Sequence, residues 1–108
     1  MKTVIIEVET VGAALLRREL FQRSAEISLP FGAVLTLQDV IERKSRDFPS
    51  LMTLVLTVPV PIATNLVAAW LYDKFKGRAR TIRIERTEIT LDKGEIEKIL
   101  IEKIESKE

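Results

Sequence analysis

The sequence contains neither cysteine nor histidine. Their absence excludes disulfides, thiolate nucleophiles and zinc sites built from these ligands, and it removes the side chain best suited to proton transfer near neutral pH. The four glycines are isolated, so the chain has no Gly-rich phosphate loop. The serines lack a histidine partner, and no close spacing of carboxylates indicates a hydrolytic pair or a metal site. We therefore expect no catalytic, cofactor-binding or metal-binding residue, and a protein that is not an enzyme.

Side-chain amides are scarce as well, limited to Gln22, Gln38 and Asn65, beside many Ile, Glu, Lys and Arg residues. This composition is like that of a thermophile's protein. With 108 residues, 46% of them hydrophobic and 31% charged, the chain is expected to form a single domain, residues 1–108. The net charge of +1 provides no strong field for steering a ligand. No apolar signal segment follows Lys2, so we expect a cytoplasmic protein.

Residues 48–72 contain no charged side chain. As one helix they would rise about 37 Å, more than the roughly 30 Å hydrocarbon core of a bilayer. Pro59 and Pro61 stand against that helix, because each removes a backbone donor and clashes with the preceding turn. Residues 51–58 alternate as a strand does, and residues 62–76 have apolar positions at helical spacing. We predict a strand, a tight Pro-Val-Pro turn and a buried helix; a single-span membrane protein through residues 48–72 is an alternative.

The first half of the chain has a weaker pattern. It predicts a strand over residues 3–9, a helix over residues 13–23 and either a short strand or a loop over residues 24–35. Thr36 and Asp39 resemble a capping box, so we expect them to open a helix that ends near residue 47.

The last third predicts a hairpin followed by a helix. Two short strands, over residues 80–85 and 88–91, are expected around an Arg86-Thr87 turn, and Asp92 with Glu95 opens a final helix. Strands separated by helices favour crossover connections. We therefore expect an α/β fold that borders on α+β, a two-layer sandwich in which helices pack on a small mixed sheet of about four strands.

Positive charge is concentrated at the end of the helix over residues 62–76 and in the hairpin that follows. Such a segment can contact phosphates of nucleic acid or another anionic surface. It can equally be a solvated helix end and an edge strand protected by charge. The candidate anion contacts are Lys74, Lys76, Arg78, Arg80, Arg83 and Arg86.

The apolar inventory is large for so short a chain. We expect part of it to stay outside the core and to form a protein interface, where aromatic side chains carry much of the binding energy. Trp70 and Phe75 have the spacing of core residues, whereas Tyr72 falls on a different helical face. The candidate interface residues are Tyr72, Phe31, Val34 and Met52.

The second half of the chain also carries a resemblance. The run IATNLVAAWLYDKFK leads into the predicted strands TIRI and EITL and then into the final helix. In this order, residues 51–104 resemble small uncharacterised prokaryotic proteins whose helix ends in a Trp-Leu-Tyr-Asp-Lys motif before a β-hairpin. They are similar, more loosely, to the effector-associated constant component of bacterial conflict systems. The resemblance implies an accessory or adaptor role without catalytic residues.

These observations favour a small, non-enzymatic protein-interaction or self-assembly module, with a protein partner and a homo-oligomeric state. The alternatives are a nucleic-acid-binding accessory protein that uses residues 74–86, and the membrane protein described above.

Overall fold

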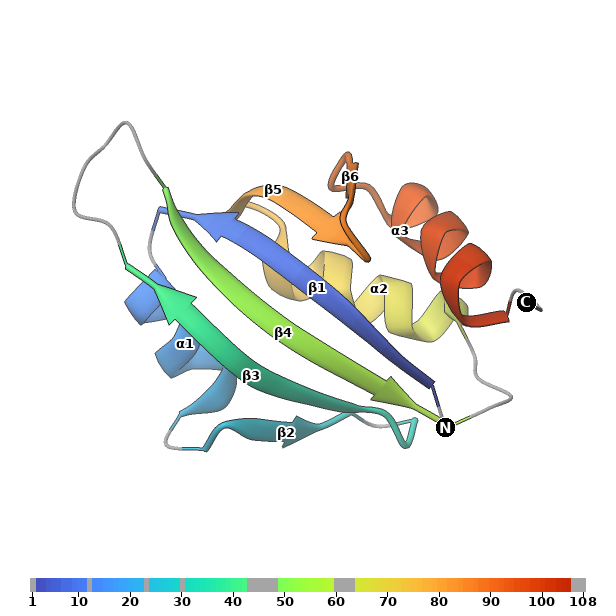
Figure 1. Cartoon of the computed structure of the whole chain (residues 1–108), viewed down its shortest axis with the longest axis horizontal. Coiled ribbons are helices and arrows are strands. Elements are labelled where there is room, and N and C mark those ends of the chain that lie inside the picture. Colours follow the sequence, from blue (N-terminus) through green and yellow to red (C-terminus); the bar gives the residue numbers. More distant parts are fainter. Residues whose placement is uncertain are drawn as a thin grey trace.

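The computed structural model describes residues 2–11, 13–22, 24–29, 31–42, 49–59 and 64–105. Helices separate groups of one to three strands along the chain (Figure 1). In order, they are β1 (Lys2–Thr10), α1 (Ala13–Phe21), β2 (Glu26–Ser28), β3 (Val34–Ile41), β4 (Ser50–Val58), α2 (Thr64–Phe75), β5 (Ala79–Ile84), β6 (Thr87–Ile89), α3 (Lys93–Leu100) and the π-helical turn η1 (Ile101–Glu105).

The described strands form one sheet in the order β2-β3-β4-β1-β5-β6. Every neighbouring pair is antiparallel. β1 lies at the centre and pairs with β4 over its whole length, from Lys2 opposite Val58 to Thr10 opposite Ser50. Without the short edge strands, the order β3-β4-β1-β5 with α1 and α2 as connections is a split β-α-β arrangement. That arrangement serves many functions, so the fold alone assigns none.

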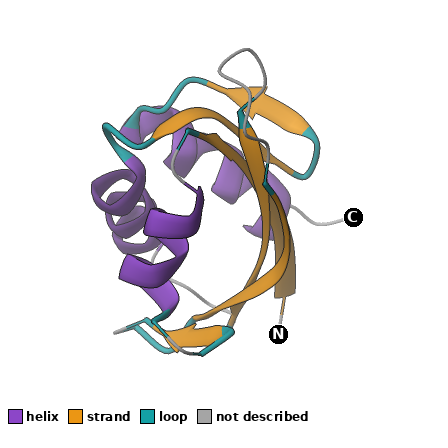
Figure 2. Cartoon of the chain, turned by 90° about the vertical axis from the view of Figure 1, so that its left-hand side faces the viewer, coloured by secondary structure: helices purple, strands orange, loops and turns teal. Residues whose placement is uncertain are grey.

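The helices pack on one face of the curved sheet, which gives two layers (Figure 2). Alternation along the central strands produces this division, because successive side chains of a strand point to opposite faces. In β1, Val4, Ile6 and Val8 are buried beneath the helices, and β4 buries every second residue from Ser50 to Val58. The helices contribute fully buried side chains to the same core, among them Leu16, Phe21, Leu71, Phe75 and Ile96.

The long uncharged run is divided between a strand and a helix, as expected. β4 ends at Val58 and α2 begins at Thr64, so the predicted strand and helix are confirmed. Residues 60–63, which include part of the predicted turn and the first two residues of the predicted helix, lie outside the described residues. Within the described part of the chain, no helix is long and apolar enough to cross a membrane.

The helix expected over residues 36–47 is wrong in the described part of that range, where residues up to Ile41 belong to strand β3. Leu37 lies opposite Leu54, but Asp39 lies opposite Thr53, so Gln38 is an extra residue in β3, a β-bulge. Because of the bulge, Leu37 and Val40 pack against the core although they are three residues apart. Three-residue spacing is typical of a helix, and here it results from a bulged strand. Residues 43–47 lie outside the described residues.

The expected mixed sheet of about four strands is also corrected. The described sheet has six strands and is antiparallel throughout. The additional strands are β3 and β2. β3 takes the place of a predicted helix, and it forms one hairpin with β4 and another with β2. The two-layer arrangement of helices on a sheet is confirmed (Figure 2).

The predicted hairpin after α2 is present, with its turn one residue earlier than expected. Ile84 lies opposite Thr87, so Glu85 and Arg86 form the turn. Both have positive φ, +50° and +69°, the conformation that two-residue hairpin turns require and that usually selects Asn-Gly. Asp92 caps α3 as expected, because its Oδ2 accepts the backbone N–H of Glu95 at 3.1 Å.

Candidate protein-interaction surface

The sheet has a second face that no described helix covers, and we call it the open face (Figure 2). Its residues are identified by register, because cross-strand partners share a face. The central strands contribute Thr3, Ile5, Glu7 and Glu9 from β1 and Leu51, Thr53, Val55 and Thr57 from β4. The outer strands add Glu26, Ser28, Val34, Thr36, Asp39, Ile41, Thr81, Arg83 and Glu88.

Apolar side chains lie in rows across the open face. One row runs from Thr36 through Val55 to Ile5, and another joins Ile41 to Leu51. Ile5 is 45% exposed and Ile41 is 43% exposed, which is high for large aliphatic side chains. Val55 and Leu51 are half-buried by their neighbours in the sheet. These rows give the open face a surface whose burial against a partner would be favourable.

Between the apolar rows, a charged row crosses five strands. Asp39, Thr53, Glu7, Arg83 and Glu88 occupy successive positions on β3, β4, β1, β5 and β6. Acidic side chains outnumber basic ones on the open face as a whole. Its charged residues are five carboxylates and one guanidinium, a formal charge of −4 carried by Glu7, Glu9, Glu26, Asp39, Glu88 and Arg83.

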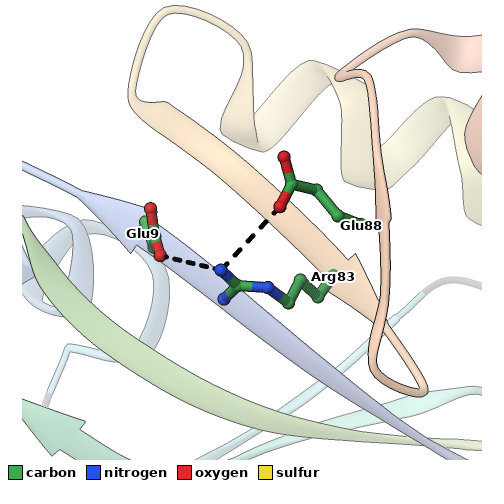
Figure 3. Close-up of polar contacts among 3 residues, drawn as sticks. All are labelled: Glu9, Arg83 and Glu88. Atoms are coloured by element: carbon green, nitrogen blue, oxygen red, sulfur yellow. Dashed lines mark hydrogen bonds and ion pairs between the residues drawn. The ribbon is translucent and has the colours of Figure 1, made fainter.

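Arg83 connects two of the acidic side chains (Figure 3). Its Nη2 lies 3.2 Å from Oε2 of Glu9 and 3.9 Å from Oε1 of Glu88. Glu7 lies directly opposite Arg83 in the register but makes no ion pair with any described residue. Within the described residues, no group of three or more acidic side chains is arranged to hold a metal ion. Among the described residues, Arg83 is therefore the only cation that forms ion pairs with the carboxylates of the open face.

A pocket of about 400 Å³ adjoins the open face near the hairpin turn, lined by Ile5, Glu7, Glu85 and Arg86. The turn is anchored to β1 beside it. The backbone N–H of Ile5 donates to Oε2 of Glu85 at 2.7 Å, and the N–H of Glu85 donates to the carbonyl oxygen of Ile5 at 2.9 Å. These bonds hold the rim of the open face in a defined position.

The six candidate anion contacts do not lie on one surface. Arg83 is on the open face among carboxylates, and Arg86 is in the hairpin turn. Lys74 and Lys76 lie on and just after α2 in the helix layer, with their Nζ atoms 5.8 Å from the ring centre of Trp70 and 5.6 Å from that of Tyr72.

Two further members of that set have distinct surroundings. Arg78 forms an ion pair with Glu19 of α1. Arg80 is exposed at a β-bulge, where Thr10 lies opposite Ala79 and Glu9 lies opposite Thr81. The cations that looked continuous in the sequence are thus distributed over the two layers and partly neutralised.

The four candidate interface residues are separated as well. Met52 is fully buried under the helices, so its assignment to a surface is corrected: it lies on the core-facing side of β4. Phe31 and Tyr72 are partly buried against the core. Val34 lies on the open face, opposite Thr57.

Sequence reasoning missed Ile5, Val55, Glu7 and Asp39 as surface candidates. The signal was present in β1 and β4, where one set of alternating positions is rich in Thr and Glu but retains Ile5, Leu51 and Val55. No family model, curated protein or solved structure matches the chain.

Proposed function

We propose that this chain is a non-enzymatic protein-interaction module that binds its partner through the open face of the sheet. The observation that carries the proposal is a sheet whose described helices all lie on one side, and whose other side combines exposed aliphatic residues with a row of carboxylates. Exposed aliphatic side chains gathered on one face are typical of protein-binding sites. An accessory or adaptor role of the kind implied by the conflict-system resemblance is consistent with such a module.

The central open-face residue Val55 provides the test. Val55→Arg places a long charged side chain among the apolar rows without altering the buried side of β4. Leu66→Arg is the matched control, because Leu66 is 49% exposed on α2 in the other layer. Tagged wild type and both variants are used to capture binding proteins from an extract of cells that naturally express the chain.

We expect wild type and Leu66→Arg to retain the same partner, own copies included, and Val55→Arg to lose it. Circular dichroism and thermal unfolding confirm that the variants are folded. Identical capture by all three proteins would show that the open face is not the binding surface.

A further inference from the structure

The charges of this molecule are segregated between its two layers. The open face carries a formal charge of −4, yet the whole chain carries +1, so the remainder of the chain carries +5. Part of this excess lies on α1, on the C-terminal half of α2 and in the turn that follows α2. Both helices lie on the other side of the sheet from the open face (Figures 1 and 2). We call this part of the excess the basic helix surface: Arg17, Arg18, Lys74, Lys76 and Arg78, with Glu19 and Asp73 among them.

The two segments of the basic helix surface meet near Arg78. Arg78 pairs with Glu19, and a pocket of about 300 Å³ is lined by residues of both segments. Lys76 lies 3.7 Å from Asp73. Arg17 and Arg18 are exposed and make no ion pair with any described residue. Leu15, 56% exposed on α1, provides an aliphatic contact beside these cations.

We propose that the partner of the open face is the basic helix surface of a second copy of this chain, so that copies associate head to tail. This inference rests on the proposed function and specifies the partner. Charge complementarity supports it, because an acidic surface and a basic surface occur on opposite sides of one molecule. Association of two open faces would instead bring the carboxylates of both copies together, which is repulsive.

The dimensions of the open face limit the area that this contact can bury. β1 and β4 are nine residues long, so the face extends about 30 Å along the strands. The strands β3, β4, β1 and β5 together are about 19 Å wide, which gives a footprint on the order of 600 Å² per partner, at the lower end for stable interfaces. Because the area is small, we expect the contact to be weak and the assembly to depend on concentration. Because a head-to-tail contact does not close on itself unless the rotation forms a ring, we expect the assembly to grow beyond the dimer.

Two charge-reversed proteins test the geometry. The face variant combines Glu7→Lys with Asp39→Lys, and the helix variant combines Arg17→Glu with Lys74→Glu. A control, Lys93→Glu with Lys98→Glu, makes the same charge change as the helix variant on α3, where both lysines are exposed. Sedimentation velocity and light scattering are measured from about 10 µM to about 1 mM chain, at about 50 mM and about 500 mM NaCl, to compare weak and strong screening.

We expect the mass of wild type and of the α3 control to rise with concentration at low salt and to fall to that of a monomer at high salt. Each reversed variant alone remains monomeric. Their equimolar mixture assembles again, because the helix variant keeps an intact open face, the face variant keeps an intact basic helix surface, and the two reversed surfaces carry opposite charges that attract each other.

Two results would overturn the inference: a monomeric wild type at the highest concentration and lowest salt, or a mixture that stays monomeric while wild type assembles. The first of these, together with a Val55→Arg variant that still loses a captured partner, would reject self-association and leave the proposed function standing. Unchanged capture by Val55→Arg would reject the proposed function itself.

Discussion

At the scale of single residues, Glu85 and Arg86 carry backbone strain that the fold tolerates. Both adopt left-handed backbone conformations in the hairpin turn, which cost a residue with a Cβ roughly 1–2 kcal/mol. The carboxylate of Glu85 offsets part of this cost by accepting the N–H of Ile5, a donor that β5 does not reach. Arg86 has no such contact with a described residue. The strain at Arg86 is therefore removable without loss of a bond.

We predict that Arg86→Gly stabilises the protein by about 0.5–1 kcal/mol, because glycine adopts positive φ without steric cost, although it loses more entropy on folding. Urea unfolding followed by circular dichroism measures the change. The control Thr87→Gly, at the adjacent strand position, should lower the free energy of unfolding by about 1 kcal/mol. Equal effects of the two substitutions would contradict the assignment of strain to Arg86.

At the scale of elements, the bulge in β3 explains why a strand had the sequence pattern of a helix. Gln38 is the extra residue, and the side chain of Asp39 accepts the N–H of Val40 at 2.9 Å next to it. This local bond replaces the helix cap that Thr36 and Asp39 suggested. β4 supplies the ladder partner for both halves of β3. Pairing with β4 therefore made this segment a strand, although its local sequence favours a helix.

We predict that deletion of Gln38 leaves the fold intact, because Leu37 and Val40 would then alternate regularly and keep Leu54 and Met52 as partners. Deletion of Val55 from the unbulged β4 is the control, since it would turn the following residues to the wrong face and abolish cooperative unfolding. Amide NMR spectra and thermal unfolding distinguish the two. Loss of the native spectrum in the Gln38 deletion would show that the bulge is needed for the fold.

At the scale of the whole molecule, the sheet separates charges that are close in the sequence. Arg83 lies on the open face, held between Glu9 and Glu88, whereas Lys74 and Lys76 lie in the helix layer (Figure 3). A polyanion on the open face would meet four carboxylates in excess. A single nucleic-acid surface along residues 74–86 is thus disfavoured by the tertiary arrangement.

This separation predicts which of these cations contribute to any affinity for nucleic acid. Lys74→Ala with Lys76→Ala should weaken binding to a labelled duplex several-fold at low salt, whereas Arg83→Ala should change it by less than about twofold. Fluorescence anisotropy at two salt concentrations provides the measurement. An equal or larger effect of Arg83→Ala would place the duplex on the open face and contradict the charge argument.

Sequence alone determined the elements whose patterns are local. The alternation of β1 and β4, the prolines after Val58 and the Asp92 cap were sufficient to predict two central strands, the start of α3 and the division of the uncharged run. Each of these depends on side-chain period or on one short-range hydrogen bond, which are properties of a short segment.

Only the tertiary structure decided what depends on pairing partners. The register with β4 made a strand of the segment at Asp39, placed Met52 in the core and left Val55 on the open face. The same pairing collected Glu7, Asp39 and Glu88, which are far apart in the chain, into one row. Alternation along a strand shows that the strand has two different faces. Which of them the helices cover depends on packing between segments that are distant in the chain.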